Sequence, residues 1–407
     1  MDDLGAPLRA LPGAERLLPA VEGLAPAWLV GGAVRDLMLG AGNVDLDVAI
    51  EGDARAAARE VAQRLGGEAV EHERFGTATV HAGDLVVDMA STRRETYARP
   101  GALPDVEPAD LEEDLARRDF TVNAMAASLP GGELVDPHGG SGDLEAGVIR
   151  VLHPGSFIDD PTRLLRAVRY EARLGFRMDP ETERLAREAV GADALSSVSG
   201  GRIRDELLDL LAEIGAVGPS AIERMSELGL DRALSPALGD AKPEDVAAAV
   251  AAAPQVGAQA QFAGLAAMVA PDPDALAAFV ERLSLRAEDR DAVLHAARKG
   301  PQLVRSLAAD LPDSALHALL HCELPETFAL ALAQGAPEEQ VTRYLEQLGG
   351  TRLEITGDDL RAAGIPESPA IGRALEETLR RKLDGEVSGR DAELELALGF
   401  ARSELGE

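Results

Sequence analysis

The sequence of 407 residues lacks the features that mark disulfide-bonded, redox-active or membrane proteins. A single cysteine, Cys322, excludes an internal disulfide, and there is no Cys-x-x-Cys pair to indicate a zinc ribbon or a redox centre. No apolar run approaches the ~18 residues of a membrane-spanning helix. The start Met1-Asp2-Asp3 has neither the basic residues nor the apolar core of a signal peptide. We therefore expect a cytoplasmic protein without a membrane segment.

Positive charge is scarce, and lysine especially so. Lysine occurs only at Lys242, Lys299 and Lys382, and acidic residues outnumber basic ones 71 to 40, which gives a formal charge of −31. This charge excludes a protein that grips nucleic acid by bulk positive charge, because neutralisation of phosphates drives that kind of binding. Nucleic-acid binding would therefore need a local patch of arginines.

Two histidines, His317 and His321, lie four residues apart beside Cys322. This spacing can place two metal ligands on one helix face. They stand in an Ala- and Leu-rich helical stretch with no further ligand evident, so we interpret them as structural. Any metal is expected to be a hard cation held by oxygen.

The chain changes character along its length. From about residue 27 to 127, short apolar runs alternate with Gly, Asp and Asn, which predicts a small mixed α/β sheet domain. Helical periodicity takes over from Asp160, and Ala-rich helical segments with Pro and Gly breaks continue to the end. The fold class predicted is α+β, an N-terminal mixed sheet followed by all-α domains. The predicted strands are 28–30, 44–50, 77–81 and 85–90, and the clearest predicted helices are 54–65, 160–174, 180–190 and 203–214.

The first polar cluster follows the first predicted strand. Gly31 and Gly32 separate that strand from a short helix, a turn whose unhindered N–H groups can hold a chain of phosphates. Arg35, one turn into the helix, can add positive charge to the same phosphates. Taken alone, a Gly-Gly pair is more often an ordinary turn.

Carboxylates follow at a regular spacing. Asp45 and Asp47 are two apart on a predicted strand, so both side chains project from one face, where they can share Mg²⁺. Asp88 ends a later apolar run and is a candidate third carboxylate from a neighbouring strand. An Asp-x-Asp alone is usually a solvated strand edge, but next to the Gly-Gly turn it matches the phosphate-plus-metal layout of phosphoryl transfer.

Two arginine-bearing segments complete the candidate site. In the segment 113–126, Arg118 can reach phosphate, and Asp119 or Asn123 can hydrogen-bond a ribose hydroxyl; the alternative is a capped helix start with solvated arginines. In the segment 159–176, Asp160 and Pro161 are typical of a helix start. The arginines that follow recur every three residues, drifting about 60° around the helix at each step, and predict a local positive patch: Arg163, Arg166 and Arg169.

Taken in order, these segments resemble the signature motifs of the bacterial tRNA nucleotidyltransferase/poly(A) polymerase family. The resemblance lies in 31–36 with 45–47, in 117–124 and in 159–170, and extends to the linking segment 134–150; it is strong over about residues 25 to 215 and moderate over 350 to 400. It implies a nucleotidyltransferase head, a nucleotide-reading neck, a helical body and a tRNA-binding tail. The corresponding ranges are 1–150, 151–218, 219–350 and 351–407.

The resemblance implies an activity and its partners. Members of the family add CMP, CMP and AMP to the 3′ end of tRNA without a nucleic-acid template, so CTP, ATP and the acceptor stem and elbow of tRNA are the implied partners. The implied cofactor is Mg²⁺. The implied residue roles are metal binding by Asp45 and Asp47, triphosphate contacts from Gly32 and Arg35, and further nucleotide contacts from Arg118, Arg166 and Arg169.

Base selection is the implied role of Asp160 and Arg163. A carboxylate and a guanidinium on one helix supply acceptors and donors that can imitate the Watson–Crick edge of a partner base. The protein would then replace the template.

Alternatives within the family change only the product. An A-adding or CC-adding partial enzyme and a poly(A) polymerase share the motifs. The connection 91–113 is long, and since the family resemblance implies that CC-adding members shorten this region, its length disfavours CC-only addition. A catalytically silent RNA-binding relative is disfavoured by the intact Asp45, Asp47 and Arg163.

Overall fold

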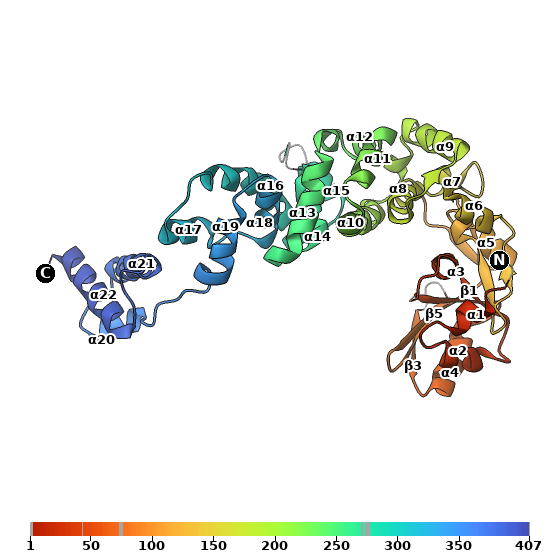
Figure 1. The fold of residues 1–407 in the computed structure, drawn as a ribbon, viewed down its shortest axis with the longest axis horizontal. Coiled ribbons are helices and arrows are strands. Elements are labelled where there is room, and N and C mark those ends of the chain that lie inside the picture. Colours follow the sequence, from red (N-terminus) through yellow and green to blue (C-terminus); the bar gives the residue numbers. More distant parts are fainter. Residues whose placement is uncertain (1–2, 43, 73–75, 270–271, 273–276, 407) are drawn as a thin grey trace. The chain divides into compact units, whose positions relative to one another are not determined.

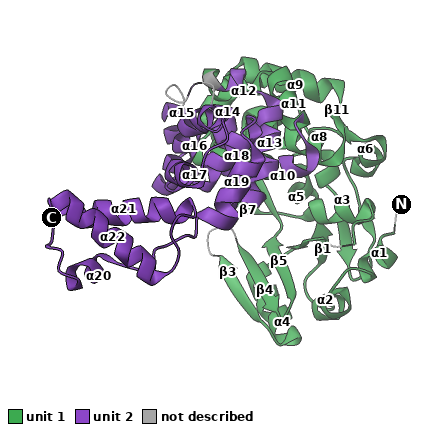
Figure 2. Ribbon diagram, turned by 60° about the vertical axis from the view of Figure 1, so that its left-hand side comes forward, with its two compact units in different colours: residues 1–213, 220–236 green, residues 214–219, 237–407 purple. Residues whose placement is uncertain are grey.

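The structure, a computed structural model, describes residues 3–42, 44–72, 76–269, 272 and 277–406. The chain divides into two compact units, which Figure 2 distinguishes by colour. The first unit consists of Met1–Glu213 and Ser220–Pro236, and the second of Ile214–Pro219 and Ala237–Glu407.

In the described part of the chain, the first unit is built around a seven-stranded sheet in the order β3-β4-β5-β2-β1-β8-β9 (Figure 1). Strands β2 and β5 are parallel, and the other neighbouring pairs are antiparallel. The four predicted strands are confirmed as β1, β2, β4 and β5. The strands of the sheet are β1 (Ala27–Val30), β2 (Leu46–Ile50), β3 (Glu68–His72), β4 (Thr77–Ala82), β5 (Leu85–Ser91), β8 (Ala126–Leu129) and β9 (Leu134–Val135).

One face of the sheet is covered by helices and the other is partly open. Helix α4 (Ala54–Leu65), predicted with these bounds, packs on β4 and β5, and α2 (Ala14–Val21) packs against α4. On β2, the buried Leu46 and Val48 flank the exposed Asp47, and strand alternation places Asp47 on the opposite face from them. Helix α5 (Leu111–Ala116) covers part of that second face, where it packs against Val30 of β1.

The rest of the first unit is mostly helical, as predicted. Leu164, Leu165 and Val168 form the buried face of α8, which packs against α11. The elements are α1 (Gly5–Arg9), α3 (Gly32–Met38), η1 (Thr121–Asn123), α6 (Gly140–Ala146), α7 (Ser156–Asp159), α8 (Arg163–Leu174), α9 (Pro180–Gly191), η2 (Ala194–Ser197), α10 (Gly200–Val217), α11 (Ser220–Leu228) and α12 (Leu230–Leu234), with the strand pairs β6 (Arg93–Thr96) with β7 (Asp105–Pro108) and β10 (Val148–Ile149) with β11 (Arg177–Met178).

Helix α8 begins three residues later than the sequence predicted. Asp160 precedes a proline and therefore adopts an extended backbone, with φ −133° and ψ 91°. Its carboxylate nevertheless accepts the N–H of Thr162 at 3.1 Å, as a capping residue does. The capping role is present, but a turn separates it from the first helical residue.

Among its described residues the second unit, which includes the end of α10, contains helices joined by loops and no strand, in agreement with the predicted all-α region. Helix α13 packs against α14 and α18, and α20, α21 and α22 form a separate apolar cluster around Leu360. The rings of His317 and His321 stack with their centroids 4.6 Å apart. None of the helices in the described ranges is long and apolar enough to cross a bilayer. The elements are η3 (Pro236–Asp240) at its start, then α13 (Pro243–Val256), α14 (Ala260–Val269), α15 (Ala277–Arg282), α16 (Ala287–Ser306), α17 (Asp313–Leu320), α18 (Pro325–Ala333), α19 (Glu338–Arg343) with a π-helical turn (Tyr344–Leu348), α20 (Gly357–Ala362), α21 (Pro369–Leu383) and α22 (Arg390–Leu405).

Candidate active site

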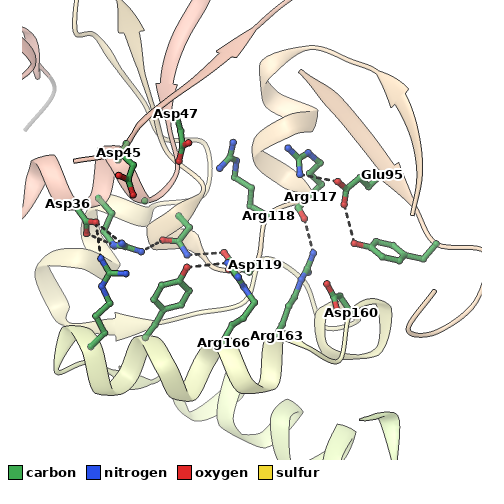
Figure 3. Close-up of a pocket in the computed structure, with 17 residues that line it drawn as sticks. Asp36, Asp45, Asp47, Glu95, Arg117, Arg118, Asp119, Asp160, Arg163 and Arg166 are labelled. Atoms are coloured by element: carbon green, nitrogen blue, oxygen red, sulfur yellow. Dashed lines mark hydrogen bonds and ion pairs between the residues drawn. The ribbon is translucent and has the colours of Figure 1, made fainter. Parts of the chain in front are cut away.

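A cavity of about 440 Å³ in the first unit brings the three motif segments together (Figure 3). Six Asp or Glu residues and six Arg residues line the cavity, so its formal charge is balanced. Recognition of a ligand therefore depends on where the positive and the negative side chains lie. Ten of the thirteen residues proposed from the sequence line the cavity: Gly32, Arg35, Asp45, Asp47, Arg118, Asp119, Asn123, Asp160, Arg163 and Arg166. Gly31, Asp88 and Arg169 do not line it.

Asp45 and Asp47 lie together at one end of the cavity (Figure 3). The sequence predicted that Asp45 lies in a strand, but Asp45 stands just before β2. Its carbonyl accepts the N–H of Asp47 at 3.1 Å. Asp88 is directly opposite Asp47 on the parallel strand β5. Its Oδ1 accepts the hydroxyl of Thr79 at 2.6 Å.

Negative charge is concentrated around Asp47. Removal of part of its hydration by surrounding protein atoms, and then the charges of Asp88 and Asp45, raise the pKa of Asp47 to about 6, although the side chain stays open to the cavity. Arg118 acts in the opposite direction. A divalent cation relieves such crowding, and carboxylate oxygens are the ligands that Mg²⁺ prefers, so this donor set fits a hard cation. Within the described residues no group of three His, Cys, Asp or Glu side chains is arranged to hold a metal, which leaves Asp45 and Asp47 as a pair.

Gly31 allows Arg118 to pass close to the backbone. Gly31 has a φ of +67°, and a Cβ at this position would lie 2.5 Å from Nη1 of Arg118. Nη2 of Arg118 donates to Asp114 at 3.0 Å, whereas Nε is buried and has no hydrogen-bond partner among the described residues. An unpaired buried donor is costly, so the position suits an acceptor such as a phosphate oxygen.

A continuous polar network joins α3 to α8. Arg35, only 2% exposed, donates from Nε and Nη2 to Asp36 at 2.8 and 2.9 Å and from Nη1 to Oδ1 of Asn123 at 2.6 Å. Asn123 donates to Oδ1 of Asp119 at 2.9 Å, and Arg166 donates to Oδ2 at 2.7 and 2.9 Å. Arg35 and Asp119, expected from the sequence to face the nucleotide, thus already have protein partners.

Asp119 remains ionised at the centre of this network. Burial by itself would raise its pKa, but the charge of Arg166 and the hydrogen bond from Asn123 outweigh burial and lower the pKa of Asp119. The network therefore fixes the distance between the Gly-Gly helix and the arginine helix through charged hydrogen bonds.

Asp160 and Arg163 lie at the other end of the cavity (Figure 3). Arg163 is 5% exposed, and its guanidinium donates to Oγ of Ser156 at 2.5 Å and to the carbonyl of Arg117 at 2.8 Å. These two bonds fix the plane of the guanidinium, which has five N–H donors, so others are left to face a ligand.

The predicted positive patch on α8 is largely compensated by acids of α10. Arg169 lies 2.6 Å from Asp209 and 3.3 Å from Glu206, and Arg166 lies 3.0 Å from Glu206. Arg169 is therefore turned toward α10 rather than into the cavity. The structure corrects the expectation of a free positive strip, because acids 40 residues away in sequence pack opposite the arginines.

Sequence reasoning missed two residues of strand β6 and its continuation. Glu95, in β6, and Tyr97, just after it, are two residues apart, and both line the cavity. Glu95 accepts hydrogen bonds from Arg117 at 3.1 Å and from the hydroxyl of Tyr97 at 3.2 Å. Burial and the charge of Glu95 raise the pKa of Tyr97 to about 12, so the phenol stays a donor. Their period-two spacing was the available signal.

Tyr170 is a further lining residue that the sequence analysis did not single out. Its ring centroid lies 5.1 Å from Cζ of Arg35 and 5.6 Å from Cζ of Arg166. Its position four residues after Arg166, on the same helix face, was the signal for it. The other missed lining residues are Ala33, Asp36, Arg117 and Arg173.

Comparisons with known proteins identify the family of the chain. Residues 27–150 match the family model described as the poly A polymerase head domain. The A-adding tRNA nucleotidyltransferase of Geobacter sulfurreducens is 38% identical over 93% of this chain, and the chain covers 45% of that protein. The CC-adding tRNA nucleotidyltransferase of Deinococcus radiodurans is 34% identical, over 90% of this chain and 87% of that protein. The chain spans less than half the length of the A-adding relatives that it matches.

Solved structures are similar over almost the whole chain. A CCA-adding enzyme in its apo form II has a TM-score of 0.82 and 34% identity, covering 98% of both chains. The Thermotoga maritima CCA-adding enzyme complexed with tRNA has a TM-score of 0.75 and 32% identity, also covering 98% of both chains. The N-terminal sheet, the motif residues in one cavity and CC-adding relatives of which the chain covers 87% to 94% together establish that this chain belongs to the tRNA nucleotidyltransferase/poly(A) polymerase family.

Proposed function

We propose that this protein adds nucleotides from CTP and ATP to the 3′ end of tRNA without a nucleic-acid template, and so completes or repairs the CCA end in the cytoplasm. The observation that carries the proposal is one cavity with the carboxylates Asp45 and Asp47 at one end and the pair Asp160 and Arg163 at the other. The first pair suits metal-dependent transfer to a hydroxyl, and the second suits recognition of a base edge.

Asp45 and Asp47 would hold Mg²⁺, with Asp88 adding negative charge from the next strand. When bound, Mg²⁺ lowers the pKa of the attacking 3′-hydroxyl and stabilises the leaving pyrophosphate. The protein itself supplies positioning. The unpaired Nε of Arg118 would donate to a phosphate oxygen, and Gly32, which lines the cavity at the start of α3, would let the triphosphate approach the backbone closely.

Asp160 and Arg163 would select the base. Cytosine and adenine both present an amino donor beside a ring-nitrogen acceptor, whereas guanine and uracil present a carbonyl acceptor beside an N–H donor. A carboxylate next to a guanidinium matches the first pattern and opposes the second. Each good polar pairing gives about 1 to 3 kcal/mol of discrimination. Acceptance of both CTP and ATP therefore needs no template.

For the remainder of the chain we propose the domain assignment of the family. Residues 1–150 form the head, 151–218 the neck, 219–350 the body and 351–407 the tail that binds tRNA. The first compact unit contains the head and most of the neck, so the nucleotide and metal residues fold within a single unit.

A second candidate is addition of the terminal A alone. Relatives named as A-adding are 38% identical over 93% of this chain or 48% identical over about half of it, whereas those named as CC-adding are 30% to 34% identical over 89% to 94% of it. Both candidates use ATP and the same carboxylates, so they differ only in whether CTP is also a substrate.

Incorporation of labelled nucleotides tests both candidates. The protein is incubated with Mg²⁺, CTP or ATP, and tRNAs that end before the first C, before the second C or before the final A. CMP and AMP incorporation supports CCA addition, and AMP incorporation on the last tRNA alone supports A addition. Asp45→Ala should abolish incorporation, whereas Asp105→Ala, at an exposed position on β7, should not. No incorporation by the unmodified protein would refute the proposal.

A further inference from the structure

Arg202, near the start of α10, joins two segments that are far apart in the sequence. Its Nη2 donates to Oδ1 of Asp160 at 2.7 Å, and its Nη1 donates to the carbonyl of Gly101 at 3.2 Å. Both ionic side chains are mostly buried, with 24% of Arg202 and 17% of Asp160 exposed. The guanidinium is planar and rigid, so it holds two acceptors in a fixed relative position.

The three donors around Asp160 all use the same oxygen. Oδ1 accepts the N–H of Thr162 at 3.1 Å, the hydroxyl of Thr162 at 2.7 Å and Nη2 of Arg202 at 2.7 Å. Within the described residues Oδ2 receives no hydrogen bond. Asp160 lines the cavity, so the geometry reserves one carboxylate oxygen for a donor in the cavity and fixes the other to the protein.

The segment held by Arg202 is the connection 97–104 between β6 and β7. Gly101 is docked by its own N–H, which donates to the carbonyl of Asp159 at 3.2 Å. Gly101 has a φ of +68°, and a Cβ there would lie 2.2 Å from Oγ of Ser197, so the close contact requires glycine. The connection is thus attached to the residue before Asp160 and to the residue that orients Asp160.

We propose that Arg202 is a positioning residue that determines base specificity, by holding Asp160 and by making its orientation depend on the docked connection 97–104. The inference rests on the proposed function, because it concerns how the same site selects its base. Arg202 does not line the cavity and acts through Asp160. If the guanidinium is lost, only the two donors of the adjacent Thr162 hold the carboxylate, which is then less firmly fixed and can present either oxygen. Discrimination against the wrong base edge then falls, while binding of tRNA is unaffected.

The test uses the full chain and a tRNA that lacks only its terminal A. The kcat/KM values for ATP and GTP are compared for the unmodified protein and for Arg202→Met. The ratio of ATP to GTP should fall roughly 10- to 100-fold, the loss expected when a recognition group is misplaced, with the KM for tRNA unchanged. Arg202→Lys, which keeps the charge but not the two-pronged geometry, should recover part of the ratio. Arg204→Met removes a charge from the same helix and should leave the ratio unchanged, since Arg204 binds the exposed Asp205.

A second variant disturbs the close packing of Gly101 against Ser197 and leaves Arg202 intact. Gly101→Ala should lower the same ratio, and Gly66→Ala is its matched control, because Gly66 also has a φ of +68° but faces open space. The proposal would be overturned if the ratio of the kcat/KM values for ATP and GTP were unchanged in both Arg202→Met and Gly101→Ala, even if both variants melted at a lower temperature. If Arg202→Met does not melt cooperatively, the ratio measured for Gly101→Ala tests the proposal in its place. Absence of incorporation by the unmodified protein would instead refute the proposed function.

Discussion

Replacement of Asp47 by asparagine should make the metal-free protein more stable while removing its activity. Removal of part of its hydration by surrounding protein atoms, and then the charges of Asp88 and Asp45, raise the pKa of Asp47 from 3.8 to about 6. The folded protein therefore binds a proton at Asp47 more tightly than the unfolded chain does. At neutral pH this carboxylate must ionise in an unfavourable place, which reduces the free energy of unfolding.

The size of the effect follows from the pKa difference. A difference of about two pKa units corresponds to about 3 kcal/mol at full strength. Asp47 is exposed to the cavity, and solvent screening reduces this figure to about 1 kcal/mol. For a unit of this size, 1 kcal/mol shifts the melting temperature by about 2 to 4 °C. Asp47→Asn should therefore melt a few degrees higher than the unmodified protein at pH 8 in the presence of a chelator.

The pH dependence has a definite sign. Between the unfolded pKa near 3.8 and the folded pKa of about 6, the folded state binds more protons at Asp47, so stability falls as pH rises through this window. The advantage of Asp47→Asn should be complete at pH 8 and should vanish near the lower pKa, where Asp47 is protonated in the folded protein. Added Mg²⁺ should stabilise the unmodified protein and not the variant.

The assay is thermal melting with matched variants. Asp105→Asn, which removes an exposed carboxylate from the same unit, serves as the control and should melt like the unmodified protein at each pH. If Asp47→Asn melts lower than the unmodified protein at pH 8 without metal, or if its advantage does not depend on pH, then the partial burial and the neighbouring carboxylates do not make the ionised Asp47 destabilising, and the reasoning is refuted.

Three further predictions concern base selection, the Gly31 turn and the binding of tRNA. Arg163→Ala should reduce discrimination among the four nucleoside triphosphates by roughly tenfold or more, since a good pairing is worth about 1 to 3 kcal/mol; competition assays measure this, and unchanged fidelity would contradict the base-reading role. Gly31→Ala should lower the free energy of unfolding by about 1 to 3 kcal/mol, because of its positive φ and the contact with Arg118, whereas the same change at the open Gly66 should cost less; denaturant titration compares the two. Binding of tRNA should weaken with added salt despite the acidic composition, because phosphates must be held by local arginines; a filter-binding affinity independent of salt would argue against such contacts.

Local sequence determined much of the fold and of the site. The apolar runs predicted β1, β2, β4 and β5, since strand propensity and flanking turn residues act over a few positions. Strand β3 was missed because its sequence Glu-Ala-Val-Glu-His is polar, as an edge strand can be. The spacing of Asp45 and Asp47 and the order of the motifs identified the lining residues at both ends of the cavity.

What the tertiary structure alone decided is which charges face one another. The sequence predicted exposed arginines on α8, but Glu206 and Asp209 of α10 form ion pairs with them. Arg35 likewise donates hydrogen bonds to Asp36 and Asn123. Sequence patterns report periodicity along one segment, whereas a salt bridge depends on the distance between two segments, which packing sets. The same reason explains why the contact of Arg202 with Asp160, 42 residues away, appears only when the chain is folded.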